Sequence, residues 1–471
     1  MWNQYYIANN LQDAVDLLAQ YKEQSKIIAG GTDLVLEMER GAHTEKSILI
    51  DISRISDLDV IQYEGDTIHI GPLVTHNQAA SSPIIQKNAT CLAEACYQVG
   101  SPQIRNRGTI AGNLLTASPA NDTITPLVAL DADIILISPR GERKVKISNF
   151  YTGVRKTLLQ KDEILKEIVI VPRRNSKSSF YKFALRNAQA ISIVNTAVNV
   201  TLENGIITSA SIAMGAVAPT IVRMKGIEKA IIGKKLSDLI SMDFSNLLSG
   251  ISPISDIRSS ADYREDMSGL LVKRCFENIQ KGILGQSTLP EKPVTLEGNQ
   301  DQTEFRGIHK TMMIDENHPI ETTINGKPYT FHGAYQKSLL HLVRENAGLV
   351  GSKEGCGEGE CGACTMYLDG KAVMSCLVPA PRAHHAQIQT IEGISDGKTL
   401  HPVQKAFIEE GAIQCGYCTP GFIMSAVKLL DENPKPTEME IKEAITGNLC
   451  RCTGYYKIVK AIEKAAHTDE R

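Results

Sequence analysis

Eight cysteines lie close together in the last third of this 471-residue chain, between Cys356 and Cys452, and they constrain its fold more than any other feature. Cys91, Cys96 and Cys275 are scattered over the first two thirds. The opening residues MWNQYYIANN lack the basic and then apolar pattern of a secretion signal, so we expect a cytoplasmic protein with reduced thiols. Metal ligation is therefore favoured over disulfides for the eight, and burial as structural thiols for the three.

Charge and hydropathy exclude two classes of partner. Lys and Arg number 50 against 53 Asp and Glu, which leaves a net charge of -3 and no basic field for nucleic acid or an anionic membrane. No apolar run approaches the roughly 20 residues of a membrane helix. The histidines form no H-E-x-x-H motif, and the pair His384-His385 is expected at the surface.

The first four of the clustered cysteines have the spacing of a plant-type ferredoxin. They follow C-x4-C-x2-C-x11-C, and glycines at 355, 357, 359 and 362 are interleaved with them. Such glycines let a tight loop direct backbone N–H groups at the sulfurs of an anionic cluster. The ligands predicted for this [2Fe–2S] site are Cys356, Cys361, Cys364 and Cys376.

The other four cysteines form a second quartet in QCGYCTPG and NLCRCTGY, with Cys415, Cys418, Cys450 and Cys452 as ligands. Thr419-Pro420 and Thr453-Gly454 are expected where helices begin, and the partial positive charge of a helix N-terminus favours an anionic centre. Structural zinc is the alternative, because C-x2-C is a common zinc half-site. The one-residue gap around Arg451 and the neighbouring ferredoxin quartet favour iron and sulfur.

The pattern of apolar and polar residues along the chain predicts an α+β multidomain protein. Short β-branched runs alternate with amphipathic stretches in residues 1–175, a second α+β lobe occupies 176–283, and a polar, Pro/Gly-punctuated linker spans 284–318. A β-rich module follows at 319–394, with hairpins at Asn325-Gly326 and Asp369-Gly370. Residues 395–471 are helical, with a capping box from Thr437 to Glu440.

Two glycine-rich segments in the first lobe suit a diphosphate. KIIAGGTDL places Gly30 and Gly31 after a β-run, and RNRGTIAGN supplies Gly108 and Gly112. Neither is the Rossmann G-x-G-x-x-G, and an ordinary structural turn is the alternative for each. There is no P-loop and no G-x-S-x-G.

These motifs together resemble the xanthine dehydrogenase, or molybdenum hydroxylase, family. ECGACTMYLDG, QCGYCTPGFIMSA and GNLCRCTGY are similar to its iron–sulfur subunit over roughly residues 320–465, and residues 1–280 are similar to its FAD-binding subunit. The resemblance implies vanillyl-alcohol-oxidase-like FAD lobes, a β-grasp plant-type ferredoxin domain and a small four-helix [2Fe–2S] bundle. Two departures are Ala190, where the family often has an acidic residue, and the flavin-first order, which indicates a gene fusion.

The resemblance also implies roles for individual residues. Gln414 matches a glutamine that contacts molybdopterin, and the helical cluster would lie nearer that cofactor on a partner chain. The residues that match FAD-contacting positions are Ile27, Ile28, Ala29, Gly30, Gly31, Thr32, Asp33, Leu34, Thr109, Ile110, Ala111, Gly112, Asn113, Asp122, Leu165 and Lys182. No catalytic residue is expected on this chain.

The predicted function is electron transfer. Electrons from a molybdopterin subunit would pass through the two clusters to FAD, and then to NAD⁺ or another acceptor. The resemblance further implies a dimer of heterodimers, and the pattern leans toward purines or N-heterocycles over carbon monoxide as the partner's substrate. A freestanding flavin–iron–sulfur reductase is one alternative, and a zinc-stapled interaction protein is another.

Overall fold

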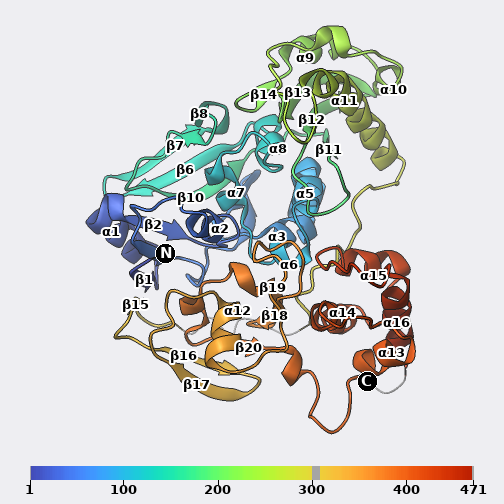
Figure 1. Ribbon diagram of the computed structural model, residues 1–471. Coiled ribbons are helices and arrows are strands. Elements are labelled where there is room, and N and C mark those ends of the chain that lie inside the picture. Colours follow the sequence, from blue (N-terminus) through green and yellow to red (C-terminus); the bar gives the residue numbers. More distant parts are fainter. Residues whose placement is uncertain (1, 300–307, 469–471) are drawn as a thin grey trace. The chain divides into compact units, whose positions relative to one another are not determined.

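The computed structural model describes residues 2–299 and 308–468, and the chain divides into two compact units that do not follow sequence order. Unit 1 combines Met1–Ser56, Gly100–Gly108 and Val294–Arg471, whereas unit 2 combines Asp57–Val99 and Thr109–Pro293. The first predicted lobe is thus shared between the two units. Figure 1 shows the helices and strands of each.

Unit 1 contains a four-stranded sheet with the order β15-β1-β3-β2. Strands β1, β2 and β3 are mutually parallel, and β15 pairs antiparallel with β1. Asn10 caps the helix that follows β1, accepting a hydrogen bond from the Asp13 N–H. The elements are β1 (Gln4–Ile7), α1 (Leu11–Tyr21), β2 (Ser25–Ile28), α2 (Leu34–Glu39), β3 (Ile48–Asp51) and β15 (Met312–Ile314).

A five-stranded sheet with the order β17-β16-β20-β18-β19 carries the first cysteine quartet. Both predicted hairpins are present, and Asn325, Gly326, Asp369 and Gly370 have the positive φ angles that a type I′ turn needs. Ser338 caps the intervening helix. The elements are β16 (Ile320–Ile324), β17 (Lys327–Phe331), α12 (Leu339–His341), a π-helical turn (Leu342–Asn346), β18 (Thr365–Leu368), β19 (Lys371–Met374) and β20 (Gln387–Gln389).

Four helices in the described part of 395–468 carry the second quartet, as predicted, and they lie together in Figure 1. The capping box of Thr437 and Glu440 is formed, and Cys418 is the N-cap of α14, the longest of these four helices. The last helix begins at Tyr456, two residues after the expected Thr453-Gly454 start. The elements are α13 (Pro402–Glu409), α14 (Thr419–Glu432), α15 (Glu438–Ala444) and α16 (Tyr456–Ala466).

The segment 284–318 is not a plain spacer. Val294 and Leu296 are buried in the core of the helical module, and Glu432 at the end of α14 accepts hydrogen bonds from the Thr295 and Leu296 N–H groups. Leu296 also accepts a hydrogen bond from the Ala372 N–H on β19, at 3.0 Å. Further along the segment, Met312–Ile314 form β15, which pairs with β1.

Unit 2 contains two sheets with different partners. The first has the order β4-β5-β10-β6-β7 and shares one apolar core with the helices around it. Strands β8 and β9 pair only with each other and form a separate two-stranded sheet. The elements are β4 (Ile61–Glu64), β5 (Thr67–Ile70), α3 (His76–Ser81), α4 (Pro83–Asn88), α5 (Thr90–Tyr97), α7 (Ile110–Thr116), α8 (Ile124–Ala129), β6 (Asp133–Ser138), β7 (Gly141–Lys146), β8 (Tyr151–Gly153), β9 (Lys156–Thr157) and β10 (Ile164–Ile170).

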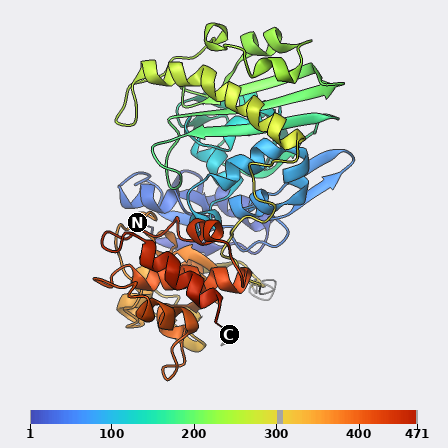
Figure 2. The same cartoon turned by 90° about the vertical axis from the view of Figure 1, so that its right-hand side faces the viewer.

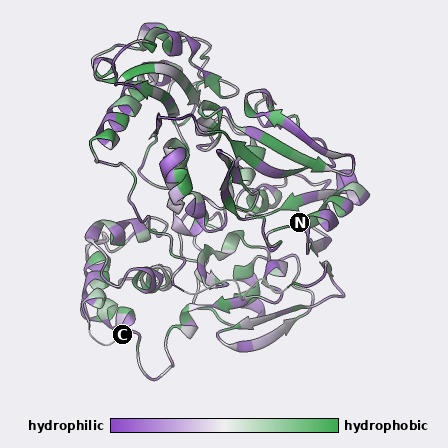
Figure 3. Cartoon of the chain, turned by 180° about the vertical axis from the view of Figure 1, so that it is seen from behind, coloured by the Kyte–Doolittle hydropathy of each residue, from purple (hydrophilic) through white to green (hydrophobic). Residues whose placement is uncertain are grey.

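The second sheet of unit 2 is antiparallel, with the order β11-β12-β13-β14, and α11 crosses it in Figure 2. Hydrophobic and hydrophilic residues alternate along α11 in Figure 3, as expected of a helix with one face on the core. The elements are β11 (Ser176–Phe183), β12 (Val194–Glu203), β13 (Ile206–Gly215), β14 (Val222–Arg223), α9 (Lys225–Ile231), α10 (Leu236–Leu239) and α11 (Ala261–Ile283).

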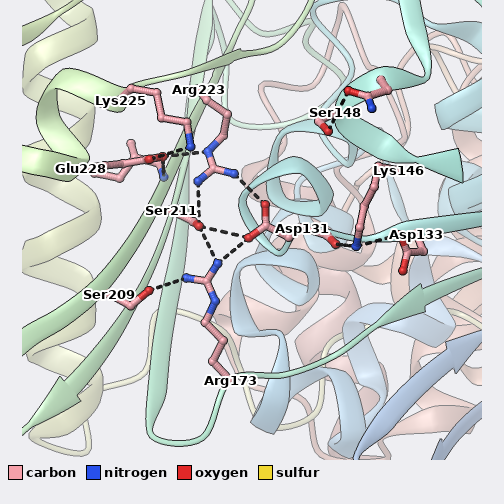
Figure 4. A network of polar contacts seen from close by, with 12 residues as sticks. Asp131, Asp133, Lys146, Ser148, Arg173, Ser209, Ser211, Arg223, Lys225 and Glu228 are labelled. Atoms are coloured by element: carbon pink, nitrogen blue, oxygen red, sulfur yellow. Dashed lines mark hydrogen bonds and ion pairs between the residues drawn. The ribbon is translucent and has the colours of Figure 1, made fainter.

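A polar network joins the two parts of unit 2 (Figure 4). Asp131, just after α8, pairs with Arg173 and with Arg223, whose Nη1 lies 2.7 Å from the carboxylate. Ser211 on β13 accepts hydrogen bonds from both guanidinium groups. Because the Asp131 side chain is about half exposed, its ion pairs contribute little to the free energy of unfolding, and we expect the network mainly to orient the two sheets.

Three further predictions concern residues outside the cysteine quartets. Cys91, Cys96 and Cys275 are fully buried, as expected. Of the pair expected at the surface, His385 is exposed, whereas His384 is buried and its Nδ1 accepts a hydrogen bond from the Glu321 N–H. Among the residues described, the structure contains no helix of sufficient length and hydrophobicity to span a bilayer.

Candidate redox centres

The first quartet is gathered by the loop before β18 and by the turn after β19. Cys364 and Cys376 are buried, with their sulfur atoms 3.4 Å apart, whereas Cys356 and Cys361 are partly buried. The Cys356 sulfur accepts backbone hydrogen bonds of 3.3–3.4 Å from residues 358, 360 and 361. A hydrogen bond from the Cys361 thiol and these backbone donors, opposed by burial, lower the pKa of Cys356 to about 5. The same hydrogen bond raises the pKa of Cys361, so these backbone donors of the loop favour a thiolate at Cys356 alone.

The second quartet is formed by the start of α14 and by the loop before α16. Cys452 and Cys415 are exposed, with their sulfur atoms 3.7 Å apart. The Cys450 sulfur accepts hydrogen bonds from the Thr453 hydroxyl at 3.1 Å and from two backbone N–H groups at 3.4 Å. Burial raises the pKa of Cys450, but the Thr453 donors outweigh it, so the net pKa is lowered.

Both quartets fit an iron–sulfur cluster. In each, two thiols face each other within 4 Å and one sulfur accepts several N–H hydrogen bonds, which is how proteins stabilise cluster sulfur. Gly359 and Gly362 have positive φ, and a Cβ atom on either would overlap neighbouring atoms. A side chain at either position would therefore strain the loop before β18.

The loops of the two quartets are in direct contact. The Leu449 N–H donates to the Cys361 carbonyl at 2.9 Å, and the Asn448 amide donates to the Gly362 carbonyl at 3.1 Å. A Cβ atom on Gly362 would overlap the Gly447 carbonyl oxygen. One backbone hydrogen bond therefore links Cys361 of one quartet to the residue before Cys450 of the other.

The segment 100–108, which comes from the first predicted lobe, braces this junction within unit 1. The buried Gln103 amide donates to Ser425 at 3.0 Å and to Asn448 at 3.1 Å. Arg105 pairs with Glu443 on α15 at 2.8 Å. Sequence reasoning missed these residues, and the only signal for them is the polar run SPQIRNRG between apolar stretches.

The first predicted flavin loop, Ile27–Leu34, lies in unit 1. Gly31 has φ +78°, and a Cβ atom on Gly30 would overlap the Arg107 carbonyl oxygen. A Cβ on Gly31 would lie 3.5 Å from the Leu377 carbonyl, one residue after the ligand Cys376. The loop is therefore adjacent to the first quartet, and its glycines permit the close backbone approach that a diphosphate site needs.

The second set of predicted flavin residues lies in unit 2. Thr109 caps α7, and Asn113 accepts hydrogen bonds from the Thr123 N–H and hydroxyl, which fixes the neighbouring Asp122. Lys182 on β11 donates to Asp122 at 2.6 Å, and both side chains are buried. Asp122 and Lys182 are thus paired directly, Asn113 is hydrogen-bonded to the residue after Asp122, and Ile110 and Ala111 are buried in the apolar core of unit 2.

Neither Leu165 nor Gln414 lies in a hydrogen-bonded site with the other predicted cofactor residues. Leu165 on β10 is buried in the apolar core of unit 2. Gln414 is exposed beside the exposed Cys415. Their predicted contacts with FAD and with a pterin remain predictions.

Comparison with known proteins covers nearly the whole chain. Residues 2–174 match the FAD binding domain in molybdopterin dehydrogenase, and residues 179–279 match the CO dehydrogenase flavoprotein C-terminal domain. Residues 322–388 match a 2Fe-2S iron-sulfur cluster binding domain, and 390–463 match a [2Fe-2S] binding domain. The nicotinate dehydrogenase FAD-subunit of Eubacterium barkeri is 35% identical over 289 residues, which are 60% of this chain and 97% of that protein. This chain belongs to the molybdenum hydroxylase family.

Within that family the chain fuses what other members carry as two subunits. The nicotinate dehydrogenase small FeS subunit of Eubacterium barkeri is 48% identical over 146 residues, 31% of this chain and 93% of that protein. A solved carbon monoxide dehydrogenase from Hydrogenophaga pseudoflava covers 59% of this chain and 98% of its own, with 31% identity and a TM-score of 0.54. The predicted FAD domain and two [2Fe–2S] domains of an oxidoreductase component are confirmed, and zinc is not supported.

Proposed function

We propose that this chain transfers electrons from a molybdopterin-bearing catalytic subunit, through its two [2Fe–2S] sites in the order helical then ferredoxin-like, to FAD and then to NAD⁺ or another acceptor. When bound, the clusters supply one-electron carriage and the flavin converts it to two-electron chemistry. The observation that carries the proposal is the 2.9 Å hydrogen bond from Leu449 to Cys361, because it joins the two ligand loops directly.

This chain's residues would hold the three groups in a fixed series. The quartet of Cys415, Cys418, Cys450 and Cys452 would hold the first cluster, and that of Cys356, Cys361, Cys364 and Cys376 the second. The contact between Gly31 and Leu377 supports flavin as the next group, because the loop Ile27–Leu34 lies beside the second quartet. Within unit 2, the buried pair of Lys182 and Asp122 matches positions that contact FAD in the family.

The exposed side of the helical quartet supports a protein partner over a freestanding reductase. Cys415 and Cys452 are exposed, and Ile413, Tyr417 and Leu449 beside them are 41%, 49% and 50% exposed. Exposed apolar side chains around a redox site suit a subunit interface. Gln414 would contact the pterin there, and a dimer of heterodimers in the cytoplasm is the expected assembly.

The names of the relatives favour an N-heteroaromatic substrate for the partner subunit. Similar proteins include a nicotinate dehydrogenase, a nicotine 6-hydroxylase and an isoquinoline 1-oxidoreductase, alongside xanthine and carbon monoxide dehydrogenases. Assays of the complex with purines, nicotinate and aldehydes test the substrate class. Bleaching of the flavin by NADH tests the acceptor.

The order of transfer is tested in the complex with its partner. Cys452→Ala removes a ligand of the helical quartet, so substrate should no longer reduce the flavin, while direct chemical reduction of the flavin should persist. Cys275→Ala, at a buried cysteine outside both quartets, is the matched control. Normal substrate-driven flavin reduction in Cys452→Ala, or a chain that is fully active without a molybdenum partner, would refute the proposal.

A further inference from the structure

Several hydrogen-bond donors converge on the Gly362 carbonyl, which lies between two ligands of the first quartet. Thr365 donates to it from its backbone N–H at 3.1 Å and from its hydroxyl at 2.7 Å, and the Asn448 amide donates at 3.1 Å. A carbonyl oxygen has two lone pairs, so these three donors saturate it. The oxygen is also tightly enclosed, because a Cβ atom on Gly421 of α14 would lie 2.2 Å from it. The loop before β18 thus has one strongly polarised peptide group.

The Asn448 amide is itself polarised by two donors. Its oxygen accepts hydrogen bonds from Gln103 Nε2 at 3.1 Å and from the Ser425 hydroxyl at 2.7 Å. Gln103 and Ser425 are fully buried, and Asn448 is 2% exposed. An amide whose oxygen accepts hydrogen bonds becomes a stronger donor through its NH2 group, and a low local dielectric constant strengthens each bond. The hydrogen bond to Gly362 is therefore the last of a chain that begins in the segment 100–108.

The other end of the same peptide group meets a predicted cluster ligand. The peptide that joins Gly362 to Ala363 carries the Gly362 oxygen and the Ala363 N–H, and this N–H hydrogen-bonds to the Cys361 sulfur. Donors on the oxygen draw electron density toward it and make the N–H a stronger donor. Hydrogen bonds to ligand sulfur stabilise the more negative, reduced state of an iron–sulfur cluster and so raise its reduction potential. One peptide group therefore connects the Asn448 amide with Cys361.

We propose that Asn448 is a positioning residue, which raises the reduction potential of the ferredoxin-like cluster through the peptide between Gly362 and Ala363. The inference rests on the proposed function, in which Cys361 is a ligand of the second cluster in the series. Asn448 itself lies two residues before Cys450, a ligand of the first cluster. The loop that holds the donor cluster thus raises the potential of the acceptor cluster, which favours transfer in the forward direction.

The test is a redox titration of the full chain with both clusters retained, followed by the electron paramagnetic resonance signals of the reduced clusters. The Cys452→Ala chain, which lacks a ligand of the helical quartet, identifies the signal of the ferredoxin-like cluster. Asn448→Leu removes the amide donor at similar side-chain volume, so we expect the equilibrium constant for reduction of that cluster to fall about threefold. For one electron this is a potential about 30 mV lower, at about 59 mV per tenfold change.

Thr365→Val removes a second donor from the same carbonyl and keeps the shape of the side chain. It should lower the potential of the ferredoxin-like cluster in the same direction and by about the same factor. Local damage from Asn448→Leu would instead change the helical cluster first, because Asn448 lies beside Cys450. A lower potential of the ferredoxin-like cluster in both variants therefore reports on the Gly362 carbonyl that the two side chains share.

Asn106→Leu is the matched control. Asn106 is also a buried amide of the segment 100–108, and it donates to the Ala372 carbonyl on β19 at 2.9 Å rather than to a cysteine loop, so both potentials should equal those of the wild type. An unchanged ferredoxin-like potential in Asn448→Leu, a change confined to the helical cluster, or an equal change in Asn106→Leu would overturn the proposal. If Asn448→Leu loses its iron, Thr365→Val decides alone: a lower potential supports the proposal and an unchanged one overturns it. A wild-type chain with only one cluster signal would instead overturn the proposed function.

Discussion

Gly362 gives the sharpest test of the junction between the two cysteine loops. It has φ +66°, which costs a residue with a Cβ atom about 1–2 kcal/mol. In Gly362→Ala the new methyl group would also overlap the Gly447 carbonyl and lie 2.5 Å from the Asn448 amide nitrogen. The Gly447 carbonyl belongs to the backbone, and the Asn448 side chain is buried and hydrogen-bonded, so neither can move aside without a cost in free energy. Overpacking therefore adds about 1–3 kcal/mol.

Gly348→Ala is the matched control for this substitution. Gly348 has φ +71° in the same unit, and a methyl group added there would meet no atom within 4 Å, so only the backbone strain applies. The loss of visible cluster absorbance with urea should occur at a lower concentration in Gly362→Ala than in Gly348→Ala, by the equivalent of about 1–3 kcal/mol. Substrate-driven flavin reduction should slow only in Gly362→Ala. Equal urea midpoints for the two variants would show that the loops are not packed as described.

Three other substitutions test separate parts of the molecule. Gln103→Leu leaves Asn448 and Ser425 without their shared donor and should cost about 1–3 kcal/mol in the urea midpoint; no change would show that Gln103 does not brace the junction. Lys182→Met leaves Asp122 buried without its cation, which costs about 3–5 kcal/mol, so purified protein should lose flavin while retaining iron. Burial, then the charges of His385 and Arg54, lower the pKa of His384 from 6.5 to about 4, so the unfolded chain binds a proton first as pH falls. Between pH 7.5 and 5.5 the wild type should lose about 1.4 kcal/mol from this residue, and His384→Asn, which keeps an acceptor for the Glu321 N–H, should lose correspondingly less in parallel urea titrations.

Local patterns in the sequence predicted local structure well. The cysteine spacing identified both quartets, and Asn325-Gly326, Asp369-Gly370 and the Thr437 capping box formed the turns and cap expected of them. Each of these depends on residues a few positions apart, where backbone preference and a single hydrogen bond decide the conformation.

Pairing between distant segments was not predictable in the same way. Nothing around Gln103 or Arg107 indicates that they contact Asn448 and Ala29, because such contacts depend on tertiary packing rather than on any local period. The same holds for Val294 to Leu296, whose polar and proline-rich surroundings read as a linker although Glu432 binds their backbone. His384 was misjudged because a buried histidine is marked only by its partners.

The composition of unit 1 from Met1–Ser56, Gly100–Gly108 and Val294–Arg471 has a consequence for synthesis. On the ribosome, Val294 emerges roughly 240 residues after Ser56, a delay of roughly 10–50 s at about 5–20 residues per second. During that time strand β1 lacks its neighbour β15, and the apolar side chains of Trp2 and Tyr5 lack the core that will bury them. Unit 2 is complete before Val294 emerges, so the first segment of the nascent chain must avoid aggregation until β15 and the remaining members of its core have been made.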